Sequence, residues 1–367
     1  MLKRMVSERI PGLQLIKEDV GRIVGAVGDA VDRFSGRTVL ITGARGFLAS
    51  YMVDTLAFLN DQSLLQRPVR ILAMIRPPTG RDDRLAHLMG RDDVQFLEQD
   101  ARQPLQFNGP LHFIVHAASA AAPKSYLKDP VGTMQTNTAA LQQLLELARD
   151  RNAESLLFFS SSEVYGTPDP ASIPTPENYL GRVDFTSRRA CYVESKRFGE
   201  TLCRGYFEQY GVPAKSVRPF HVHGPGLRLD DGRIVAELIS QGLANRPIEL
   251  LSDGRATRTY GYVSDATVGF FKVLLSSCNG DAFNVGADSP ETSILELAQT
   301  ISRLFGRQES IRVNTATKPA HLQDAPDRAC PDLTKIRRLL NYRPQVGLAE
   351  GLERTITWHK RRLEQTD

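Results

Sequence analysis

Hydrophobic positions along the first part of the chain follow two different rhythms. Residues 16–34 carry apolar side chains at helical spacing, with charged residues on the opposite side: Ile16, Val20, Ile23, Val24, Val27, Val31 and Phe34. From Arg37 onward, short aliphatic or β-branched runs alternate with longer amphipathic stretches. The pattern predicts a leading helix, packed on the main body or on a partner subunit, followed by an α/β region.

The alternation after Arg37 predicts strands at residues 38–42, 69–75, 94–97, 113–116, 155–160 and 214–218. Helices are expected at residues 47–59, 130–149 and 190–209. Strands separated by helical crossovers indicate a parallel, doubly wound Rossmann sheet. After Pro219 the pattern changes to loops and shorter helices at 233–245, 294–304 and 348–363, and residues 260–265 are expected to return into the main sheet.

These elements divide the chain into three parts within the α/β class. Residues 1–36 form a leading amphipathic arm. Residues 37–218 form a dinucleotide-binding domain, with a return segment near 260–285. Residues 219–259 and 286–367 are expected to form a smaller C-terminal substrate-binding domain.

Composition narrows the class of partner. The chain has 367 residues, 41% hydrophobic and 24% charged, as expected of a folded domain protein. Its net charge of +4 is dispersed, because acidic residues interleave with basic ones, so no nucleic-acid partner is expected. No apolar run approaches the about 20 residues that a membrane span needs, and residues 1–9 lack the apolar core of a signal peptide.

The cysteines point to a reducing compartment. Cys191, Cys203, Cys278 and Cys330 are scattered, and none has a metal-ligand spacing with another cysteine or with the histidines. Free thiols, no bound metal and a cytoplasmic location are therefore expected.

A tyrosine and a lysine four residues apart supply the main candidate chemistry. On a helix, Tyr192 and Lys196 point from the same face, and a neighbouring ammonium lowers the pKa of a phenol. Such a phenol can take a proton from an alcohol near neutral pH. The spacing alone is also compatible with an ordinary solvated helix face.

A glycine-rich turn after the first predicted strand indicates a dinucleotide site. In the segment from Thr42 to Ala49, glycines allow a tight turn and bring backbone N–H groups to a pyrophosphate at a helix N-terminus. The expected cofactor-binding residues here are Gly43, Arg45, Gly46, Phe47 and Leu48.

The ends of the next strands complete the expected cofactor site. Where an acid that binds the ribose of NAD is expected, the chain has Ile75–Arg76, so NADP is an alternative to NAD, and a surface arginine that covers the adenine is another reading of Arg76. Asp100 and Ala101 follow the third strand on the adenine side, and Ala117 and Ser119 follow the fourth along the middle of the cofactor.

Ser160-Ser161-Ser162-Glu163-Val-Tyr-Gly166 ends the fifth predicted strand, where open α/β sheets place their chemistry. With these motifs in order, the chain from Arg37 to Trp358 resembles the extended short-chain dehydrogenase/reductases that act on nucleotide sugars. Its closest likeness is to the UDP-glucuronate decarboxylases. The segments that carry this likeness are Glu177-Asn-Tyr179-Leu-Gly-Arg-Val-Asp, Arg189-Ala-Cys191-Tyr192-Val-Glu-Ser-Lys196-Arg and Asp231-Gly-Arg233-Ile-Val.

The resemblance implies a set of roles. Tyr192 would be the base at the C4 hydroxyl, Lys196 would assist it and bind the nicotinamide ribose, Ser161 would orient the hydroxyl, and Glu163 would act at C5. The implied substrate-binding residues are Tyr126, Ser162, His221, Arg233 and Arg258. The implied reaction uses NAD to oxidise C4, loses carbon dioxide from a uronate, and returns the hydride. A homodimer built from two helices per subunit, one of them the Tyr192 helix, is also implied.

The chain departs from the family pattern at two further positions. His221 replaces an asparagine, and Gly226 replaces an arginine that follows Gly224–Pro225; both lie where sugar-nucleotide phosphates are held. A 4,6-dehydratase and a 4-epimerase are the alternative enzymes, although Ser162 stands where dehydratases often place an aspartate. A non-catalytic nucleotide-sensing scaffold of the same fold is the alternative outside enzymes.

Overall fold

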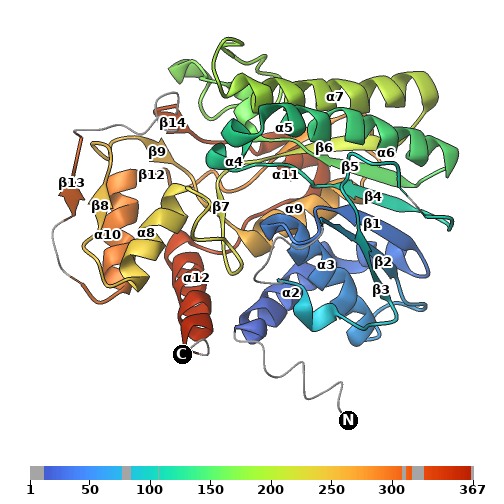
Figure 1. The fold of residues 1–367 in the computed structure, drawn as a ribbon, viewed down its shortest axis with the longest axis horizontal. Helices are drawn as coiled ribbons and strands as arrows, with labels where there is room; N and C mark the ends of the chain where they lie inside the picture. Colours follow the sequence, from blue (N-terminus) through green and yellow to red (C-terminus); the bar gives the residue numbers. More distant parts are fainter. Residues whose placement is uncertain (1–11, 77–83, 106, 308–310, 316–325, 365–367) are drawn as a thin grey trace.

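A seven-stranded parallel sheet forms the centre of the molecule (Figure 1). The computed structural model describes residues 12–76, 84–105, 107–307, 311–315 and 326–364. The strand order is β11-β6-β5-β4-β1-β2-β3, which confirms the expected Rossmann architecture. The strands are β1 (Thr38–Thr42), β2 (Arg70–Ile75), β3 (Val94–Glu98), β4 (Phe113–His116), β5 (Ser155–Phe159), β6 (Ala214–Pro219) and β11 (Ala282–Val285).

Helices cover both faces of the sheet because its strands are apolar on both sides. On β1, Val39 and Ile41 belong to one hydrophobic cluster and Leu40 to another. The first cluster includes side chains of α2 (Leu13–Val27), α3 (Phe47–Asp61) and α9 (Val263–Leu274). The second includes side chains of α6 (Ala139–Asp150) and α7 (Ala190–Tyr210), and α5 (Pro130–Asn137) packs beside both of these helices.

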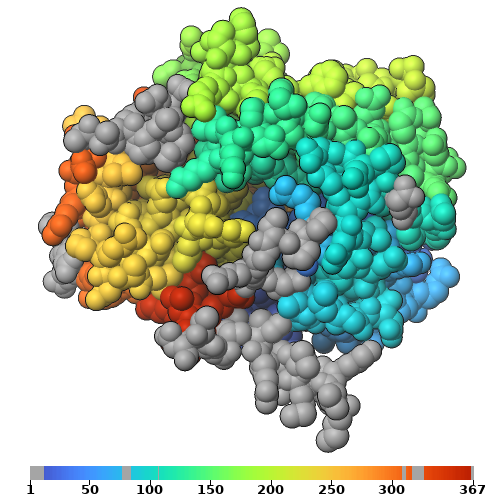
Figure 2. All heavy atoms as spheres, viewed as in Figure 1, coloured from blue at the N-terminus to red at the C-terminus, as the bar shows by residue number. Residues whose placement is uncertain are grey.

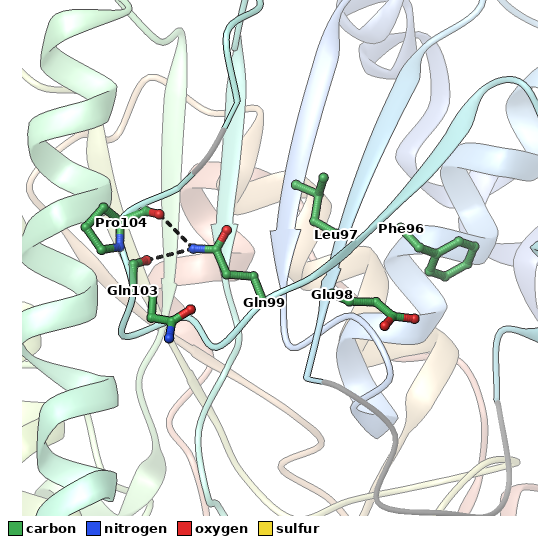
Figure 3. Close-up of a pocket in the computed structure, with 6 residues that line it drawn as sticks. All are labelled: Phe96, Leu97, Glu98, Gln99, Gln103 and Pro104. Atoms are coloured by element: carbon green, nitrogen blue, oxygen red, sulfur yellow. Dashed lines mark hydrogen bonds between the residues drawn. The ribbon is translucent and has the colours of Figure 1, made fainter.

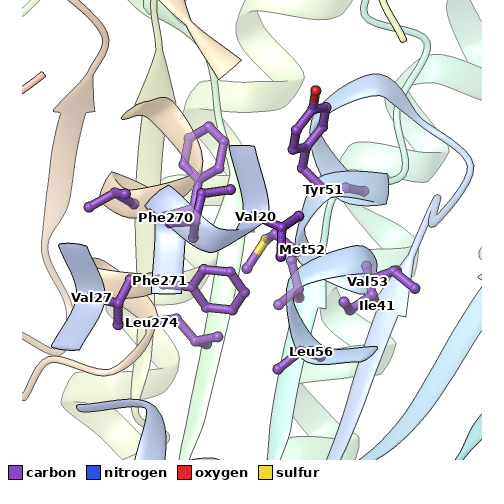
Figure 4. Close-up of a cluster of buried hydrophobic side chains, with 14 of the residues drawn as sticks. Val20, Val27, Ile41, Tyr51, Met52, Val53, Leu56, Phe270, Phe271 and Leu274 are labelled. Atoms are coloured by element: carbon purple, nitrogen blue, oxygen red, sulfur yellow. The ribbon is translucent and has the colours of Figure 1, made fainter. Parts of the chain in front are cut away.

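The leading helix lies inside the first of these layers. α2 packs against α3 and α9, so it covers the main body of its own chain. Figure 4 shows Val20 and Val27 beside Phe270, Phe271 and Leu274. The helix is shorter than residues 16–34, because Gly28 ends it with φ 66° and a 3₁₀ helix (Gly28–Phe34) follows.

Two other expected elements differ in the structure. Residues 130–149 form two helices, because the backbone leaves helical geometry at Thr138 (φ −118°, ψ −72°). Residues 260–265 do not enter the main sheet: β10 (Gly261–Tyr262) pairs with β7 (Val222–His223), and α9 begins at Val263. The apolar run that starts there continues at helical spacing to Leu274, and β11 provides the returning strand beside β6.

The C-terminal residues form a smaller group with its own apolar cluster, which includes Leu238, Leu297 and Ile356. It contains α8 (Ile234–Leu243), α10 (Ile294–Leu304) and α12 (Leu348–Leu363). Both α10 and α12 begin and end at the predicted residues. Its short strands are β8 (Glu249–Leu250), β9 (Thr257–Arg258), β12 (Thr292–Ser293), β13 (Arg312–Val313) and β14 (Arg328–Ala329), and α11 (Thr334–Leu340) packs on β11. Figure 2 shows the yellow and orange atoms of this group against the blue and green atoms of the sheet domain.

Within the described part of the chain, no helix combines the length and the apolar character needed to cross a bilayer.

Candidate active site

α7 carries Tyr192 and Lys196 one turn apart, and both side chains are buried. Lys196 Nζ donates a hydrogen bond to the carbonyl oxygen of Phe159, at the end of β5 (2.6 Å), and lies 5.6 Å from the centroid of the Tyr192 ring. The Tyr192 ring stacks on Tyr126 of α4 (Pro123–Lys128), with centroids 5.0 Å apart and planes inclined by 12°. The helix therefore brings phenol and ammonium together at the end of β5.

Burial sets the ionisation of this pair. It raises the pKa of Tyr192 to about 12, and the negative charge of Glu163 acts in the same direction, whereas a hydrogen bond with Ser161 opposes them. Burial lowers the pKa of Lys196 to about 7, which the charge of Glu200 partly offsets. The pKa of Tyr192 is thus raised overall, and Lys196, whose Nζ bonds to a strand carbonyl, is not among the main groups that act on it. That Lys196 assists ionisation of Tyr192 stays a prediction.

Ser161 and Glu163 lie next to the Tyr192 hydroxyl. Ser161 is the N-cap of a 3₁₀ helix (Ser162–Tyr165), and its Oγ accepts a hydrogen bond from the backbone N–H of Glu163 (3.1 Å). The same hydroxyl bonds to Tyr192, so its orientation is fixed from two sides. Glu163 is close enough to raise the pKa of both Tyr126 and Tyr192. Ser162 is half-buried in the first turn of the 3₁₀ helix.

Arg189 is a further residue of the site, and in the sequence it begins the segment that contains Tyr192 and Lys196. It is the N-cap residue of α7, and its Nη2 lies 2.9 Å from Glu163 Oε2. Its charge also lowers the pKa of His221 and of Arg258. Arg189 therefore lies between the proton-transfer residues and the basic residues of the C-terminal group. Its place three residues before Tyr192 was the signal that could have identified it.

Basic side chains converge around His221. Burial lowers the pKa of His221 to about 3, and the charges of Arg258, Arg233 and Arg189 lower it further, so the imidazole is neutral. Its Nδ1 is buried without a hydrogen-bond partner in the described structure, as is the hydroxyl of Tyr260, whose ring meets the imidazole edge-on. This arrangement leaves polar atoms and excess positive charge for an anionic ligand.

Arg258 bonds to backbone carbonyls, whereas Arg233 lies near a carboxylate. The buried guanidinium of Arg258 donates from Nη1 to the carbonyl of Thr257 (2.7 Å) and from Nη2 to that of Pro326, so no carboxylate satisfies these bonds. Arg233, which precedes α8, has its Nε 3.4 Å from Asp231 Oδ2. Burial lowers the pKa of Arg258, and the charge of Arg189 acts in the same direction, whereas Tyr260 and Asp327 oppose them.

The glycine turn has the geometry that a pyrophosphate requires. Gly43 has φ 67°, and a Cβ on it would lie 2.7 Å from the Cα of Ala118. Gly46 is the N-cap residue of α3, and no side chain caps the N–H groups of the first turn, where Phe47 and Leu48 lie. The residues present thus fit a dinucleotide, because the turn offers free backbone donors and admits no side chain at Gly43.

The other expected cofactor residues follow the neighbouring strands. The carboxylate of Asp100 is held by Arg102 (Oδ2 to Nη2, 2.7 Å), which lowers its pKa, with a smaller contribution from Arg76. Arg45 Nη1 donates to the carbonyl of Arg76 (3.3 Å). Ala101 follows Asp100 and is half-buried, Ala117 packs on the core, and the Oγ of Ser119 is buried with no partner among the described residues. A buried hydroxyl without a hydrogen-bond partner is typical of a site where a bound ligand provides that partner.

A half-buried ion pair next to Lys196 is a feature that no sequence motif indicated. Arg218 of β6 pairs with Glu200 of α7 (2.5 Å) and donates to the hydroxyl of Tyr165 (2.8 Å). Glu200 also accepts a hydrogen bond from Ser160 (2.5 Å). Glu200 lies one turn after Lys196 on α7, so this network holds the helix against the ends of β5 and β6.

A shallow hollow lies at the far edge of the sheet (Figure 3). It is lined by Phe96, Leu97, Glu98, Gln99, Gln103 and Pro104. Gln99 Nε2 donates to the carbonyls of Gln103 (2.9 Å) and Pro104 (2.8 Å), which closes the loop that carries Asp100. The strand order separates this hollow from β5 by β2, β1 and β4, so it belongs to the adenine side and not to Tyr192.

Several known proteins are similar to this chain in sequence. UDP-glucuronic acid decarboxylase 1 of Xenopus tropicalis is 34% identical over 328 residues, covering 89% of this chain and 73% of the relative. UDP-glucuronic acid decarboxylase 5 of Arabidopsis thaliana is 33% identical over 318 residues, covering 87% and 88% of the two chains.

Solved structures share the fold at lower identity. A dTDP-glucose 4,6-dehydratase from Streptomyces venezuelae, with NAD bound, has a TM-score of 0.76 and 24% identity over 89% of this chain and 99% of that one. A UDP-glucuronic acid 4-epimerase from Bacillus cereus, in complex with UDP-glucuronic acid and NAD, has a TM-score of 0.72 and 24% identity over 88% and 99%.

The family model described as "NAD dependent epimerase/dehydratase family" matches residues 39–286, which is more than half of the chain. This segment contains the glycine turn, the serine–glutamate loop and the Tyr192–Lys196 pair. Like the relatives that match it at 30–34% identity, the chain therefore belongs to the NAD dependent epimerase/dehydratase family.

Proposed function

We propose that this enzyme decarboxylates UDP-glucuronate after oxidising its C4 hydroxyl with bound NAD. The observation that carries the proposal is the group of Arg189, Arg233 and Arg258 around the neutral His221, beside Glu163. This group suits a substrate with both a diphosphate and a sugar carboxylate. The curated relatives that cover most of this chain are named for the same reaction.

The chain's own residues would carry the proton transfers. Tyr192 would take the proton of the C4 hydroxyl. Ser161 would orient that hydroxyl, because the Ser161 side chain is hydrogen-bonded to the phenol of Tyr192. NAD, when bound, accepts a hydride from C4 and later returns it. Glu163 would move the proton at C5, since its charge acts directly on the Tyr192 phenol.

Loss of carbon dioxide follows from the position of the ketone. A 4-keto uronate is a β-keto acid, so the C5–carboxylate bond can break with its electrons delocalised onto the C4 oxygen. Glu163 would deliver a proton from water to C5, and the return of the hydride to C4, with the proton held by Tyr192 going back to the C4 oxygen, then completes a pentose nucleotide. Arg189, which pairs with Glu163, limits the negative charge next to Tyr192 and therefore assists its ionisation.

Substrate binding is proposed for the C-terminal group, residues 219–259 and 286–367. Arg233, Arg258 and His221 belong to it and would hold the anionic parts of the substrate. Tyr126 and Ser162 would contact the sugar from the sheet domain, because Tyr126 stacks on Tyr192 and its hydroxyl has no partner among the described residues.

The test is a product analysis. The protein with NAD and UDP-glucuronate should release carbon dioxide and form a UDP-pentose, seen by mass spectrometry. A product that has lost water would indicate a 4,6-dehydratase, and an unchanged mass with an inverted C4 would indicate a 4-epimerase. Complete absence of turnover with a panel of nucleotide sugars, although NAD binds, would favour the scaffold alternative.

A substitution of Arg258 tests whether this side chain contacts an anionic part of the substrate. Arg258→Ala should lower kcat/KM for UDP-glucuronate by about tenfold or more, because a charge-assisted bond to an anion is lost. Arg255→Ala is the matched control, since that side chain is 89% exposed and three residues away. Equal activity of Arg258→Ala and the wild type would contradict an anion contact.

We also propose that the protein is a cytoplasmic homodimer formed through α5 and α7. These helices pack side by side (Figure 1), and they expose the large apolar side chains of Val131, Met134 and Phe198. Exposed apolar groups on neighbouring helices are typical of an interface between subunits. The four cysteines are free, which suits a reducing compartment.

A further inference from the structure

Arg84 places a largely buried positive charge against α3. Its side chain is 10% exposed, and its Nη2 lies 2.7 Å from Asp54 Oδ2. The guanidinium also lies over the ring of Tyr51, 5.3 Å from the centroid. None of the roles assigned to the site so far involves this arginine.

Part of the hydrogen-bonding capacity of Arg84 is unused. Its Nε and Nη1 are buried and have no hydrogen-bond acceptor in the part of the chain that the structure describes, whereas Nη2 pairs with Asp54 Oδ2. Asp54, the neighbouring carboxylate, is also shared with His87, whose Nε2 lies 2.7 Å from Oδ1. Buried guanidinium donors without acceptors cost free energy, so their presence indicates an acceptor that a ligand supplies.

The position of Arg84 identifies the ligand chemistry. Gly226 has φ 90°, and a Cβ on it would lie 3.0 Å from Arg84 Nε and 3.7 Å from Phe47 Cδ2. Phe47 is the first residue of α3, directly after the glycine turn. Arg84 and the first residue of α3, which adjoins the expected pyrophosphate site, thus both lie beside the loop that contains Gly226.

The glycine at position 226 makes this placement possible. A Cβ at this position would press on Arg84 Nε, and the φ of 90° also favours glycine. Arg84, which follows β2 and precedes β3 in the chain, therefore reaches the loop that contains Gly226.

We propose that Arg84 binds a diphosphate at the junction between α3 and the loop around Gly226, and that Asp54 restrains the guanidinium until the anion is present. Both NAD and a sugar nucleotide carry this group. The inference rests on the proposed function only for the second source.

The test compares variants that should change affinity in opposite directions. Dissociation constants for NAD and for UDP would be measured by calorimetry at low and at high ionic strength. Arg84→Gln should weaken one of the two ligands by about tenfold or more and reduce the salt dependence of its binding. Asp54→Asn should tighten the same ligand, because the charge of Arg84 is then uncompensated.

Controls separate binding from folding. Arg84→Lys keeps the charge and should retain most of the affinity, and Arg228→Gln, at a side chain that is 76% exposed, should leave both constants unchanged. If Arg84→Gln does not fold, the double variant with Asp54→Asn removes both buried charges together and should show the same weakened binding. Thermal unfolding of each variant would establish that it is folded.

The outcomes are distinct. A loss confined to NAD assigns Arg84 to the cofactor, and a loss confined to UDP assigns it to the substrate. If Arg84→Gln and Asp54→Asn both weaken binding, or neither changes it, Arg84 only joins elements of the fold and the proposal is wrong. Decarboxylation of UDP-glucuronate by a protein whose affinities do not depend on Arg84 would overturn this inference and leave the proposed function intact.

Discussion

The ionisation of Tyr192 decides whether the site can remove a proton. Burial and Glu163 raise its pKa to about 12, so the phenol is protonated near neutral pH in the structure described. Positive charges and hydrogen-bond donors near its oxygen lower the pKa of Tyr192, and Ser161 is one such donor. The tyrosine is therefore suited to act as a base only when the completed site stabilises its phenolate.

Replacement of the phenol oxygen should remove this chemistry. Tyr192→Phe is expected to lower kcat by about 100-fold or more, because a positioned acid–base group is lost, while NAD remains bound. Single-turnover absorbance of reduced cofactor would show it. Tyr206→Phe, on the same helix with its hydroxyl bonded to Glu146, should keep its activity. Retained turnover in Tyr192→Phe would contradict the proposed base.

Lys215, which lies away from the site, should make the free energy of unfolding depend on pH. Burial lowers its pKa to about 7, from an ordinary value of 10.5, while Nζ donates to Ser155 Oγ (2.9 Å) and to the carbonyl of Ser276 (3.0 Å). Between these pH values the unfolded chain binds more protons than the folded one, so the free energy of unfolding rises with pH.

Lys215→Met should therefore flatten the rise in stability between pH 7 and pH 9, which urea unfolding at several pH values would measure. Lys17→Met, at an exposed position on α2, is the control and should keep the wild-type slope. A slope unchanged by Lys215→Met would show that the lysine stays charged in the folded protein.

At the scale of elements, α2 behaves as part of the Rossmann core. Its apolar stripe is buried against α3 and α9, and the side chain of Ile23 is 0% exposed. Helices of this length depend on such packing more than on their own propensity.

Shortening one side chain on this stripe should be costly. Ile23→Ala is expected to lower the free energy of unfolding by about 2–5 kcal/mol, because it leaves a cavity between α2 and α9. Denaturant unfolding would measure the change. Glu18→Ala, at a partly exposed position on the same helix, should cost less than about 1 kcal/mol. Similar losses for both would mean that α2 is not packed as described.

The paired helices α5 and α7 allow a test of assembly. Met134→Glu places a charge among exposed apolar side chains, so it should shift the protein from dimer to monomer. Light scattering after gel filtration would report the mass. Leu339→Glu, an equally exposed apolar position on α11, should not alter it. A wild type that is monomeric throughout would contradict the proposed interface.

At the scale of the whole molecule, one carboxylate joins segments from both ends of the chain. Asp19 of α2 is fully buried and accepts hydrogen bonds from Tyr51 (3.1 Å), Tyr262 (2.8 Å) and Arg354 (2.9 Å). These residues belong to α3, β10 and α12, so the network ties the leading helix to the sheet domain and to the C-terminal group.

Removal of this carboxylate should destabilise the molecule as a whole. Asp19→Ala is expected to cost about 3–5 kcal/mol, because Arg354 loses its buried partner. The decrease in thermal midpoint, measured by calorimetry, should appear as one cooperative transition. Separate transitions for the two parts would show that other contacts, and not Asp19, couple them.

How much could be predicted depends on whether a feature is local. The strand–helix alternation, α10, α12 and the position of the glycine turn follow from patterns within a few residues, because hydrophobic periodicity reports which face is buried. The division at Thr138 and the end of α2 at Gly28 are local too, but they depend on backbone angles that the apolar pattern does not reveal.

The sequence by itself determined the family, the sheet and the residue types at the centre, since Tyr192, Lys196 and Ser161 occur in motifs of fixed spacing. Only the tertiary structure decided the pairing of Glu163 with Arg189, the gathering of three arginines around His221, and the place of Arg84 beneath Gly226. The physical reason is that burial and long-range charge set these interactions, and both depend on segments that are distant in the chain.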